Sequence, residues 1–418
     1  MSGPLSGVTV LEMCNTIAGP ACGRLLADFG ANVIKLEPPE GDSVRQLGDH
    51  IDDVSLYAAS ILRNKRSVAI DLKTREGREL GIALASKVDV LIENNRPGVL
   101  ERLGFDFEEL SQANRGLVLV RISGYGQSGP YSDRPGYGAI CEAVGGVRHM
   151  TGRPDLPPDR VALATTDYLT SVYAAFGALA ALRAREQTGR GQIVDVALYE
   201  TAFTQMEPVV PAYDKLKIVP SRQGPNLPSM APNSLYPTRD GKWVLIAANS
   251  DRTFHRLAEA MGAPELLGDE RFSSIVARGK HENARALDDI IDAWTSGLDA
   301  VDAERVVREA GVPSSRVYTI ADIWDDPQYA ARGMLLDVPH MRLGSIKQIG
   351  IVPKLSSTPG SVRFAGPELG ADTFEVLREL AEVPEERLRS LASRGVIKAG
   401  EDAHGSMRIP EVPEAGTA

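Results

Sequence analysis

Short apolar runs alternate with longer amphipathic runs through the first part of the chain. The apolar runs are rich in Val, Ile and Leu, which is typical of strands buried on both faces, and they predict strands at 7–13, 31–39, 66–72, 88–94 and 116–126. The runs at 18–30 and 74–87 have the length and periodicity of helices. Strands and helices that alternate in this way predict an α/β fold with a Rossmann-like parallel sheet.

The pattern continues into the second half of the chain, where two proline-rich stretches interrupt it. Further runs predict a helix at 168–186, a strand leading into a helix at 191–200, a strand at 242–249, helices near 252–262 and 284–296, and helical structure at 371–394. Prolines and polar residues are frequent at 207–236 and again at 335–365, and this composition favours linkers or long loops.

A chain of 418 residues exceeds the roughly 250–300 residues that one hydrophobic core usually spans, so we expect two lobes. The predicted parts are a large domain over 1–206, a linker over 207–236, a smaller α/β domain over 237–334, a second linker over 335–365, a C-terminal part over 366–400 that packs on the large domain, and a loosely ordered tail over 401–418.

Composition narrows the class of protein. The hydrophobic fraction of 43% and the charged fraction of 24% are ordinary for a globular enzyme, and no apolar run approaches the length of about 18 residues that a membrane span needs. The opening MSGPLSGVTVLEM has no basic and apolar regions of a secretory signal, and three widely spaced cysteines fit a reducing compartment, so we expect a cytoplasmic protein. The net charge of -10 disfavours binding to nucleic acids and to acidic membranes.

Several common catalytic and cofactor motifs are missing from the sequence. The turn after the first strand lacks G-x-G-x-x-G, which removes support for dinucleotide binding. No G-x-S-x-G, H-E-x-x-H, Walker A or C-x-x-C motif occurs, and the six histidines lack metal-ligand spacing. We therefore expect neither a serine hydrolase nor a metal site.

One acidic residue, Asp167, directly precedes a long run of small and apolar residues. In ALATTDYLTSVYAAFGALA (162–180), Thr165 or Thr166 can cap a helix and so place Asp167 in its first turn. Free N–H groups and the helix dipole there favour an ionised carboxylate, which is able to attack an acyl carbon. A plain electrostatic match to the helix start explains the same residue, and this stretch by itself leaves both interpretations open.

Glycines and basic residues offer further candidates. The turn ISGYGQSGP (122–130) either presents backbone N–H groups to an oxyanion or simply turns the chain after a strand. His149 lies close before the Asp167 helix and is a candidate site residue. Basic side chains follow strand ends of the first lobe, where ligands of doubly wound sheets bind, and they either meet phosphates or form a solvated face: Lys65, Arg66, Lys73, Arg75, Arg96 and Arg102.

Together these segments resemble the class III coenzyme A transferases, the family of formyl-CoA transferase and carnitine CoA-transferase. The resemblance runs from GVTVLEM to about residue 205, resumes near 222–260, and is loose after that. Its best-matching pieces are AGPACGRLLADFGANVIKLEPPEGDSVR, NKRSVAIDLKTREGREL, DVLIENNRPGVLERLGF, GYGQSGPYSDRPGYGAICEAVGG and TTDY…TGRGQIVDVALYE. The resemblance implies an interlocked, ring-like homodimer.

The resemblance also implies roles for individual residues. Asp167 matches the catalytic aspartate, which forms an acyl anhydride and then an aspartyl-CoA thioester. Coenzyme A is then a substrate, and no metal or redox cofactor is implied. The matching CoA contacts are Ile70 and Lys73 around the adenosine and its phosphates, Asn94 and Arg102 near the pantetheine and phosphates, Ile17 at the thioester site, and Tyr137 close to the acyl group.

Departures from the family pattern bear on the substrate. Pro38 stands where many relatives carry an Arg, so that Lys35 or Arg45 would have to replace its CoA contact. Ile17 replaces the Gln of formyl-CoA transferases, and RQGPNLPSMAPN has no run of glycines, so oxalate is not the expected acceptor.

Three hypotheses follow from the resemblance. RPGYGAICEAVGGVRHMTG resembles members that move CoA among dicarboxylates, and Arg148 or His149 would hold a distal carboxylate. The leading hypothesis is therefore a transferase that moves CoA, with succinyl-CoA as a possible donor, to a dicarboxylic, hydroxycarboxylic or carnitine-like acid. The second is an acyl-CoA racemase, although Tyr137 and Gly138 occupy the positions of the racemase His–Asp pair. The third is a non-catalytic CoA-binding paralogue.

Overall fold

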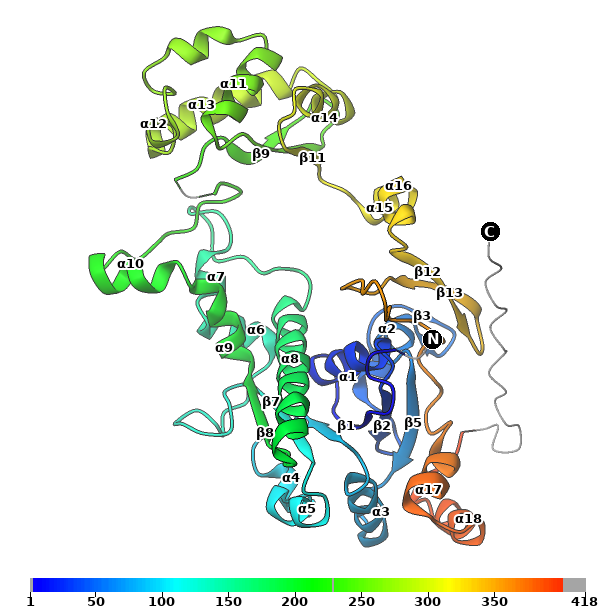
Figure 1. Cartoon of the computed structure of the whole chain (residues 1–418). Helices are drawn as coiled ribbons and strands as arrows, with labels where there is room; N and C mark the ends of the chain where they lie inside the picture. Colours follow the sequence, from blue (N-terminus) through cyan, green and yellow to red (C-terminus); the bar gives the residue numbers. More distant parts are fainter. Residues whose placement is uncertain (1–2, 228, 401–418) are drawn as a thin grey trace. The chain divides into compact units, whose positions relative to one another are not determined.

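The computed structural model describes residues 3–227 and 229–400 (Figure 1). The predicted tail at 401–418 lies outside the described residues. The chain divides into two compact units. The first contains the described residues up to Gly146, then Ala162–Glu207 and the described residues from Arg332 onward, and the second contains Val147–Val161 and Pro208–Ala331. The short segment Val147–Val161, which the sequence pattern placed in the large domain, thus groups with the second unit.

A seven-stranded sheet forms the centre of the first unit, in the order β14-β5-β2-β1-β6-β7-β8. Its strands are β1 (Thr9–Met13), β2 (Asn32–Glu37), β5 (Lys65–Ile70), β6 (Val90–Glu93), β7 (Val118–Ser123), β8 (Ile193–Ala197) and β14 (Ile397–Lys398). Every neighbouring pair is parallel except β14 and β5, which run antiparallel. The predicted α/β fold with a parallel sheet is confirmed.

Helices cover both faces of this sheet, which explains why its strands read as continuous apolar runs. Successive residues of β1 point to opposite sides: Val10 packs in the layer of α1 (Ala18–Asp28) and α8 (Thr165–Thr188). Leu11 packs in the layer of α3 (Arg75–Ala85), α17 (Thr373–Ala381) and α18 (Glu385–Ser393). Buried alanines on α8 face α1 and let the two helices approach closely: Ala174, Ala178 and Ala181.

Shorter elements complete the first unit. They are η1 (Ser43–Gln46), α2 (Leu56–Ile61), α4 (Val99–Arg102), α5 (Phe107–Ala113), α6 (Gly138–Val144), α9 (Leu198–Phe203), η2 (Thr204–Met206), and the hairpins β3 (His50–Ile51) with β4 (Val54–Ser55) and β12 (Leu335–His340) with β13 (Gly344–Ile349). The hairpin β12–β13 lies inside the stretch predicted as the linker 335–365. Pro339 lies within β12, and a proline is unusual inside a strand, so the local pattern resembled a loop.

The second unit is built around a small antiparallel sheet, β11-β10-β9. Its strands are β9 (Asn233–Pro237), β10 (Trp243–Ala247) and β11 (Ser314–Arg316), and its helices are α7 (Val147–Met150), α10 (Val209–Leu216), α11 (Asp251–Ala260), η3 (Pro264–Gly268), α12 (Ile275–Arg278), α13 (His281–Thr295), α14 (Ala300–Glu309), α15 (Ile320–Asp325) and α16 (Pro327–Ala331). Val244 and Ile246 of β10 pack with Phe254, Leu287 and Val307 in its core. The stretch predicted as the linker 207–236 contains α10 and the start of β9.

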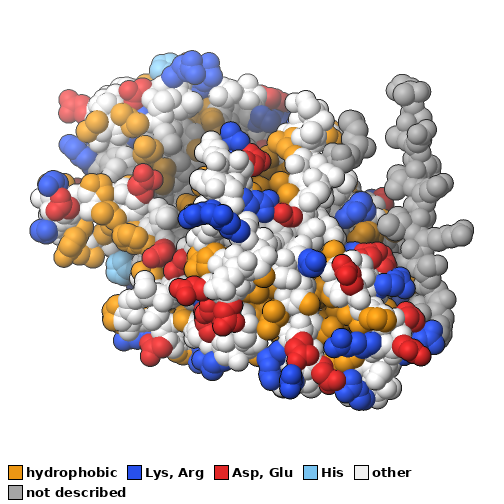
Figure 2. All heavy atoms as spheres, turned by 60° about the horizontal axis from the view of Figure 1, so that its bottom comes forward, with side chains coloured by type: hydrophobic (Ala, Val, Ile, Leu, Met, Phe, Trp, Pro, Cys, Tyr) orange, Lys and Arg blue, Asp and Glu red, His pale blue; other side chains and the backbone are white. Residues whose placement is uncertain are grey.

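The face of the molecule drawn in Figure 2 carries charges of both signs. On the face shown in Figure 2, basic side chains stand next to acidic ones, so that face presents no broad patch of one charge. None of the helices in the described part of the chain combines the length and the apolar character that a membrane span requires.

A buried ion pair joins α1 to segments that are distant in sequence. Arg63 donates to both oxygens of Asp28, at 3.0 and 2.6 Å, and Asn64 donates a third hydrogen bond at 2.9 Å. Arg63 also donates to the carbonyl of Ile349 on β13 at 2.6 Å. Both charged side chains are buried. Because water cannot solvate them there, each charge needs the opposite charge of the other residue.

Replacing Asp28 with Ala should lower the free energy of unfolding by about 3–5 kcal/mol, because Arg63 would remain buried without its carboxylate. Urea unfolding measures this change. Glu309→Ala is the control, since it removes an exposed ion pair with Arg305 and should cost less than about 1 kcal/mol. Equal, small losses in both variants would contradict the assignment.

Candidate active site

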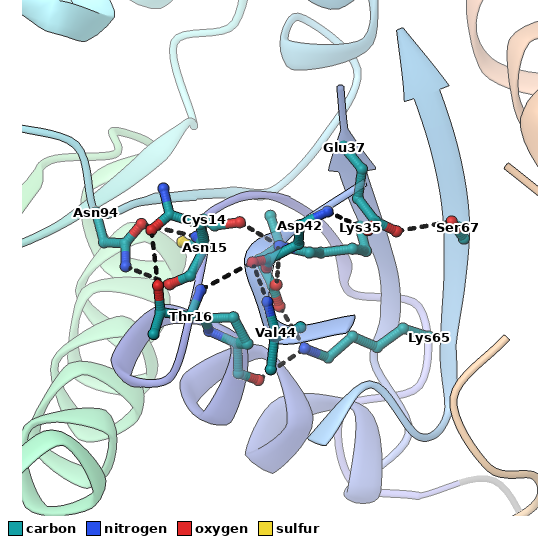
Figure 3. A network of polar contacts seen from close by, with 12 residues as sticks. Cys14, Asn15, Thr16, Lys35, Glu37, Asp42, Val44, Lys65, Ser67 and Asn94 are labelled. Carbon is teal, nitrogen blue, oxygen red and sulfur yellow. Dashed lines mark hydrogen bonds and ion pairs between the residues drawn. The ribbon is translucent and has the colours of Figure 1, made fainter. Parts of the chain in front are cut away.

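A buried network of charges surrounds the turn between β1 and α1 (Figure 3). Lys35 on β2, only 1% exposed, forms ion pairs with Glu12 at 3.3 Å and with Asp42 at 2.8 Å, and it donates to the carbonyl of Cys14. The second oxygen of Asp42 accepts hydrogen bonds from the backbone N–H of Thr16 at 3.0 Å and of Val44 at 2.9 Å. Burial alone lowers the pKa of Lys35, but attraction to Glu12 and Asp42 outweighs burial, and the pKa lies above its ordinary value. Lys35 is therefore charged.

The same turn is held from its other side by Asn94, at the end of β6. The Asn94 side chain accepts from the backbone N–H of Asn15 at 2.9 Å and donates to the carbonyl of Asn15 at 2.8 Å. Thr16 adopts a φ of 65°, a left-handed conformation that a β-branched residue rarely takes. Three successive residues are thus fixed by side chains from neighbouring strands and loops, which keeps the strained turn in place. Ile17 follows directly and is the N-cap of α1.

Asp167 lies half-buried in the first turn of α8, as predicted. The predicted cap is wrong: α8 already starts at Thr165, its N-cap is Ala164, and no side chain caps it. The first-turn N–H groups therefore have no side-chain acceptor at the N-cap, and the positive end of the helix dipole favours a carboxylate there. One turn further, the Ser171 hydroxyl contacts the carbonyl oxygens of Asp167 and Ala18, both at 2.7 Å, which joins α8 to the first residue of α1.

The carboxylate of Asp167 lies against the backbone at the start of α6. A Cβ atom added to Gly138 would come within 2.0 Å of Oδ2 of Asp167, so a larger residue here would displace this carboxylate. Tyr137, the N-cap of α6, is 74% exposed beside it. The approach of Gly138 to Asp167 depends on a second close contact, between the backbones of Gly124 and Gly136. A Cβ added to Gly124 would lie 2.9 Å from the Cα of Gly136. Glycines after β7 and before α6 therefore bring Tyr137 and Gly138 to the carboxylate.

Two tyrosines lie next to this point. The hydroxyls of Tyr57 and Tyr168 are 2.9 Å apart, and both rings pack with Ile17 against a small apolar cluster. Burial raises the pKa of Tyr57 well above its ordinary value, and the neighbouring Tyr168 and Asp167 raise it further, so the phenol stays protonated. Tyr168 belongs to the TTDY segment, whereas nothing in the local sequence marked Tyr57 as a neighbour of Asp167.

The remaining predicted CoA contacts follow other elements of the first unit. Lys73 is 84% exposed after β5, with its amine 3.9 Å from Glu40. Arg102, on α4, lines an open cleft together with Arg75 and Arg78. Ile70 is fully buried in the core, and its backbone pairs with Ile397, so it can meet a ligand only through backbone atoms. The structure brings Ile17, Tyr137 and Asp167 together near the Asn94-held turn, and places Ile70, Lys73 and Arg102 elsewhere along the unit.

The family model described as CoA-transferase family III matches residues 5–373 of this chain. The chain belongs to CoA-transferase family III. It is therefore an enzyme of the CoA-transferase class, as the sequence resemblance predicted.

Named relatives cover almost the whole chain. The succinyl-CoA–D-citramalate CoA-transferase of Chloroflexus aurantiacus is 45% identical over 94% of this chain and 98% of that protein. The beta subunit of the succinyl-CoA–L-malate CoA-transferase of the same species is 40% identical, over 94% and 98%. Among solved structures, a CAIB/BAIF family protein from Brucella suis superposes with a TM-score of 0.82 at 33% identity, over 91% of this chain and all of that one.

Several basic residues of this family III member already form ion pairs with acidic side chains inside the fold. Lys35 lies in the buried network, and Arg45 donates to Glu37 at 2.8 and 2.7 Å, so neither side chain extends to replace the Arg that is absent at Pro38. Lys65 is fully buried and pairs with Glu12 at 2.7 Å, which removes it from the phosphate candidates.

Two other expectations also change. In the glycine turn, the N–H of Gly126 donates to the Ser123 hydroxyl and that of Gln127 donates to Asp195, each at 2.9 Å, so neither stabilises an oxyanion. Arg148 and His149 belong to α7 in the second unit, where His149 contacts the carbonyl of Pro220 at 3.1 Å. Across the residues that the structure describes, no group of three or more His, Cys, Asp or Glu side chains is placed to hold a metal ion.

Gly138→Ala should reduce kcat for CoA transfer about 100-fold, because the new Cβ would displace the Asp167 carboxylate, and small displacements of a reacting group have costs of this order. Steady-state kinetics measure the effect, and thermal melting checks that the variant is folded. Gly268→Ala is the matched control, since a Cβ there meets nothing within 4 Å. Wild-type turnover by a folded Gly138→Ala enzyme would show that this contact does not position Asp167.

Proposed function

We propose that this enzyme moves CoA from succinyl-CoA, or a similar acyl-CoA, to a dicarboxylic or hydroxycarboxylic acid through covalent intermediates on Asp167. The observation that carries the proposal is the position of the Asp167 carboxylate, in the first turn of α8 and against the backbone of Gly138 at the start of α6. The names of the two Chloroflexus relatives, both succinyl-CoA-dependent, support the choice of donor and of acceptor class.

The chemistry requires one nucleophile and no change of oxidation state. An oxygen of Asp167 attacks the thioester carbonyl of the donor, the C–S bond breaks, and the CoA thiolate leaves a mixed anhydride. The thiolate then attacks the aspartyl carbonyl, which releases the donor acid and forms an aspartyl-CoA thioester. The acceptor carboxylate attacks this thioester to give a second anhydride and CoA thiolate. Attack of the thiolate on the acceptor carbonyl yields the new acyl-CoA and restores Asp167.

Each group near Asp167 fits a part of this sequence. The starts of α8 and α6 present backbone N–H groups, which stabilise the negative charge that develops on a tetrahedral carbon. Ile17 and the Tyr57–Tyr168 pair provide a partly apolar wall beside the carboxylate, which limits the access of water to the anhydride.

CoA in this proposal is a substrate, and neither a metal nor a redox cofactor takes part. Lys73 and Arg102 are the exposed cations for its phosphates, while the backbone of Ile70 contacts the adenosine. Asn94 lies beside the pantetheine. Its side-chain oxygen accepts one hydrogen bond from Asn15 and its side-chain nitrogen donates one to Asn15. The oxygen can accept one more hydrogen bond and the nitrogen can donate one more, which leaves both available to the pantetheine.

Asp167→Asn should reduce kcat by about 1,000-fold or more, since the amide is a poor nucleophile and the variant has no substitute for it. Wild-type enzyme mixed with succinyl-CoA and then hydroxylamine should carry a hydroxamate on Asp167, located by peptide mass spectrometry. Asp302→Asn is the control, because Asp302 also lies in the first turn of a helix, α14, but in the second unit. An unmodified Asp167 together with an active Asp167→Asn variant would rule the mechanism out.

The alternative function, an acyl-CoA racemase, predicts a different result in an exchange experiment. A racemase would exchange the α-hydrogen of a branched acyl-CoA with solvent deuterium in the absence of any acceptor acid. The proposed transferase should show no exchange under those conditions and should form product only when an acceptor is added.

We also infer that two copies of the chain associate through the exposed side of α8. Large apolar side chains are exposed on three helices of the first unit that contact one another, α6, α8 and α9: Ile140, Val144, Val172, Phe176, Leu179 and Phe203. Exposed apolar side chains on helices that contact one another are typical of a subunit interface. A second copy is the proposed occupant, since most oligomers of soluble proteins are symmetric homodimers and the family resemblance implies one.

Phe176→Asp should convert the dimer to monomer, because Phe176 is 69% exposed at the centre of α8 and would bury a charge in the interface. Light scattering after size-exclusion chromatography measures the mass. Val301→Asp is the control, an exposed valine on α14 of the second unit. A wild-type monomer, or a mass that doubles only with a different chain present, would contradict the homodimer.

A further inference from the structure

Arg24 is a buried cation on the face of α1 that contains Ile17. Ile17, Ala21, Arg24 and Asp28 recur at spacings of three and four residues, so they lie along one side of the helix. Arg24 is only 8% exposed. Long cationic side chains are rarely buried to this degree unless an acid pairs with them.

Within the described part of the chain, the Nε of Arg24 is buried without a hydrogen-bond partner. Asp28, one turn further along α1, is already occupied by two hydrogen bonds from Arg63 and one from Asn64. The charge of Asp28 acts on Arg24 without forming a hydrogen bond to it, so a surplus positive charge rests on Arg24.

This surplus charge is unfavourable in the absence of a ligand. Burial, and next the nearby Arg63, lower the pKa of Arg24 below its ordinary value. An arginine stays protonated nevertheless, so the desolvated charge is retained. A bound anion would compensate it with charge-assisted hydrogen bonds.

Arg24 lies beneath the aromatic pair that lies next to Asp167. Its guanidinium carbon is 5.9 Å from the centre of the Tyr168 ring, and Tyr168 follows Asp167 in the chain. The Tyr57 hydroxyl contacts that of Tyr168 at 2.9 Å, and the charges of both Asp167 and Arg24 act on the Tyr57 phenol. Ile17, Tyr57 and Tyr168 are all half-buried, so the residues above Arg24 remain partly open to solvent.

We propose that Arg24 binds the carboxylate at the unreacting end of a dicarboxylic substrate while the other end meets Asp167. The inference rests on the proposed function, and it assigns to the first unit the role that the sequence pattern gave to Arg148 or His149. The same residue would select the succinyl group of the donor and the diacid acceptor, since both carry a free carboxylate at the same end. Monocarboxylic acids of equal length lack the group that pairs with Arg24.

The test compares isotope-labelled succinate with monomethyl succinate as acceptors, at saturating unlabelled succinyl-CoA, so that transfer to succinate is seen as label entering the acyl-CoA. Wild-type enzyme should favour the diacid by more than about tenfold in kcat/KM, which is the scale of a charge-assisted hydrogen bond. Arg24→Met should raise the KM for succinate about 10- to 100-fold and change kcat/KM for the monoester less than about threefold. Arg24→Lys should restore part of the preference, because the charge remains. Arg305→Met, an exposed arginine of the second unit, is the matched control.

Trapping with hydroxylamine separates this inference from the proposed function. If wild-type enzyme forms the Asp167 adduct but Arg24→Met keeps the wild-type preference for the diacid, Arg24 has no part in recognition and the inference is overturned. If the wild type forms no adduct at all, the proposed function itself fails.

Two further outcomes also decide the matter. Should Arg24→Met not fold, the wild-type comparison suffices, since equal use of succinate and its monoester overturns the inference. A variant that dissociates into monomers with unchanged acid preference would overturn it as well, because Arg24 would then pair with an acid of a second copy.

Discussion

The buried ion pairs of Lys35 are the interaction on which the geometry of the site depends. Lys35 and Lys65 share Glu12, and Asp42 supplies the second negative charge, so that two cations and two anions are enclosed together. Such a group is costly to desolvate and adds little to stability by itself. What it provides is a fixed position for backbone atoms, because Lys35 and Asp42 bind the carbonyl of Cys14 and the N–H of Thr16.

This fixed turn helps to determine where the carboxylate of Asp167 lies. Thr16 holds a left-handed conformation only because the turn is bound on both sides, and the direction of α1 follows from it. The first residue of α1 then accepts a hydrogen bond from Ser171, which sets the start of α8 and therefore Asp167. From β2 to Asp167, each step is a short contact between buried or half-buried groups, so a displacement of the turn is passed on to the Asp167 carboxylate.

The sequence predicted the elements of the first unit well but few of their long-range contacts. Strands buried on both faces leave apolar runs that are visible in the sequence. The stretch around Asp167 by itself left two interpretations open, and it was the resemblance of the surrounding segments to a family that favoured a nucleophile. The meeting of Gly138 with Asp167 joins residues 29 positions apart through a loop crossing at Gly124 and Gly136. No local pattern encodes such a crossing. Ile70 shows a second limit of the sequence. The family match predicted a contact with CoA at this position, but it could not show that the side chain is buried and that only the backbone could make the contact.

Pairing, and not the number of basic residues, decides which cations of this acidic chain can serve its anionic substrates. Lys35, Lys65 and Arg45 are neutralised by acids inside the fold, although two of them stand close to the site. Arg102 shares an open cleft with two other arginines, which suits phosphates that must bind and leave with CoA. Arg24 is the opposite case, a buried guanidinium beside the aromatic wall of the site. A ligand carboxylate there gains more from pairing than one at the surface, because solvent screens it less. A buried cation therefore discriminates between acids, whereas exposed cations mainly attract them.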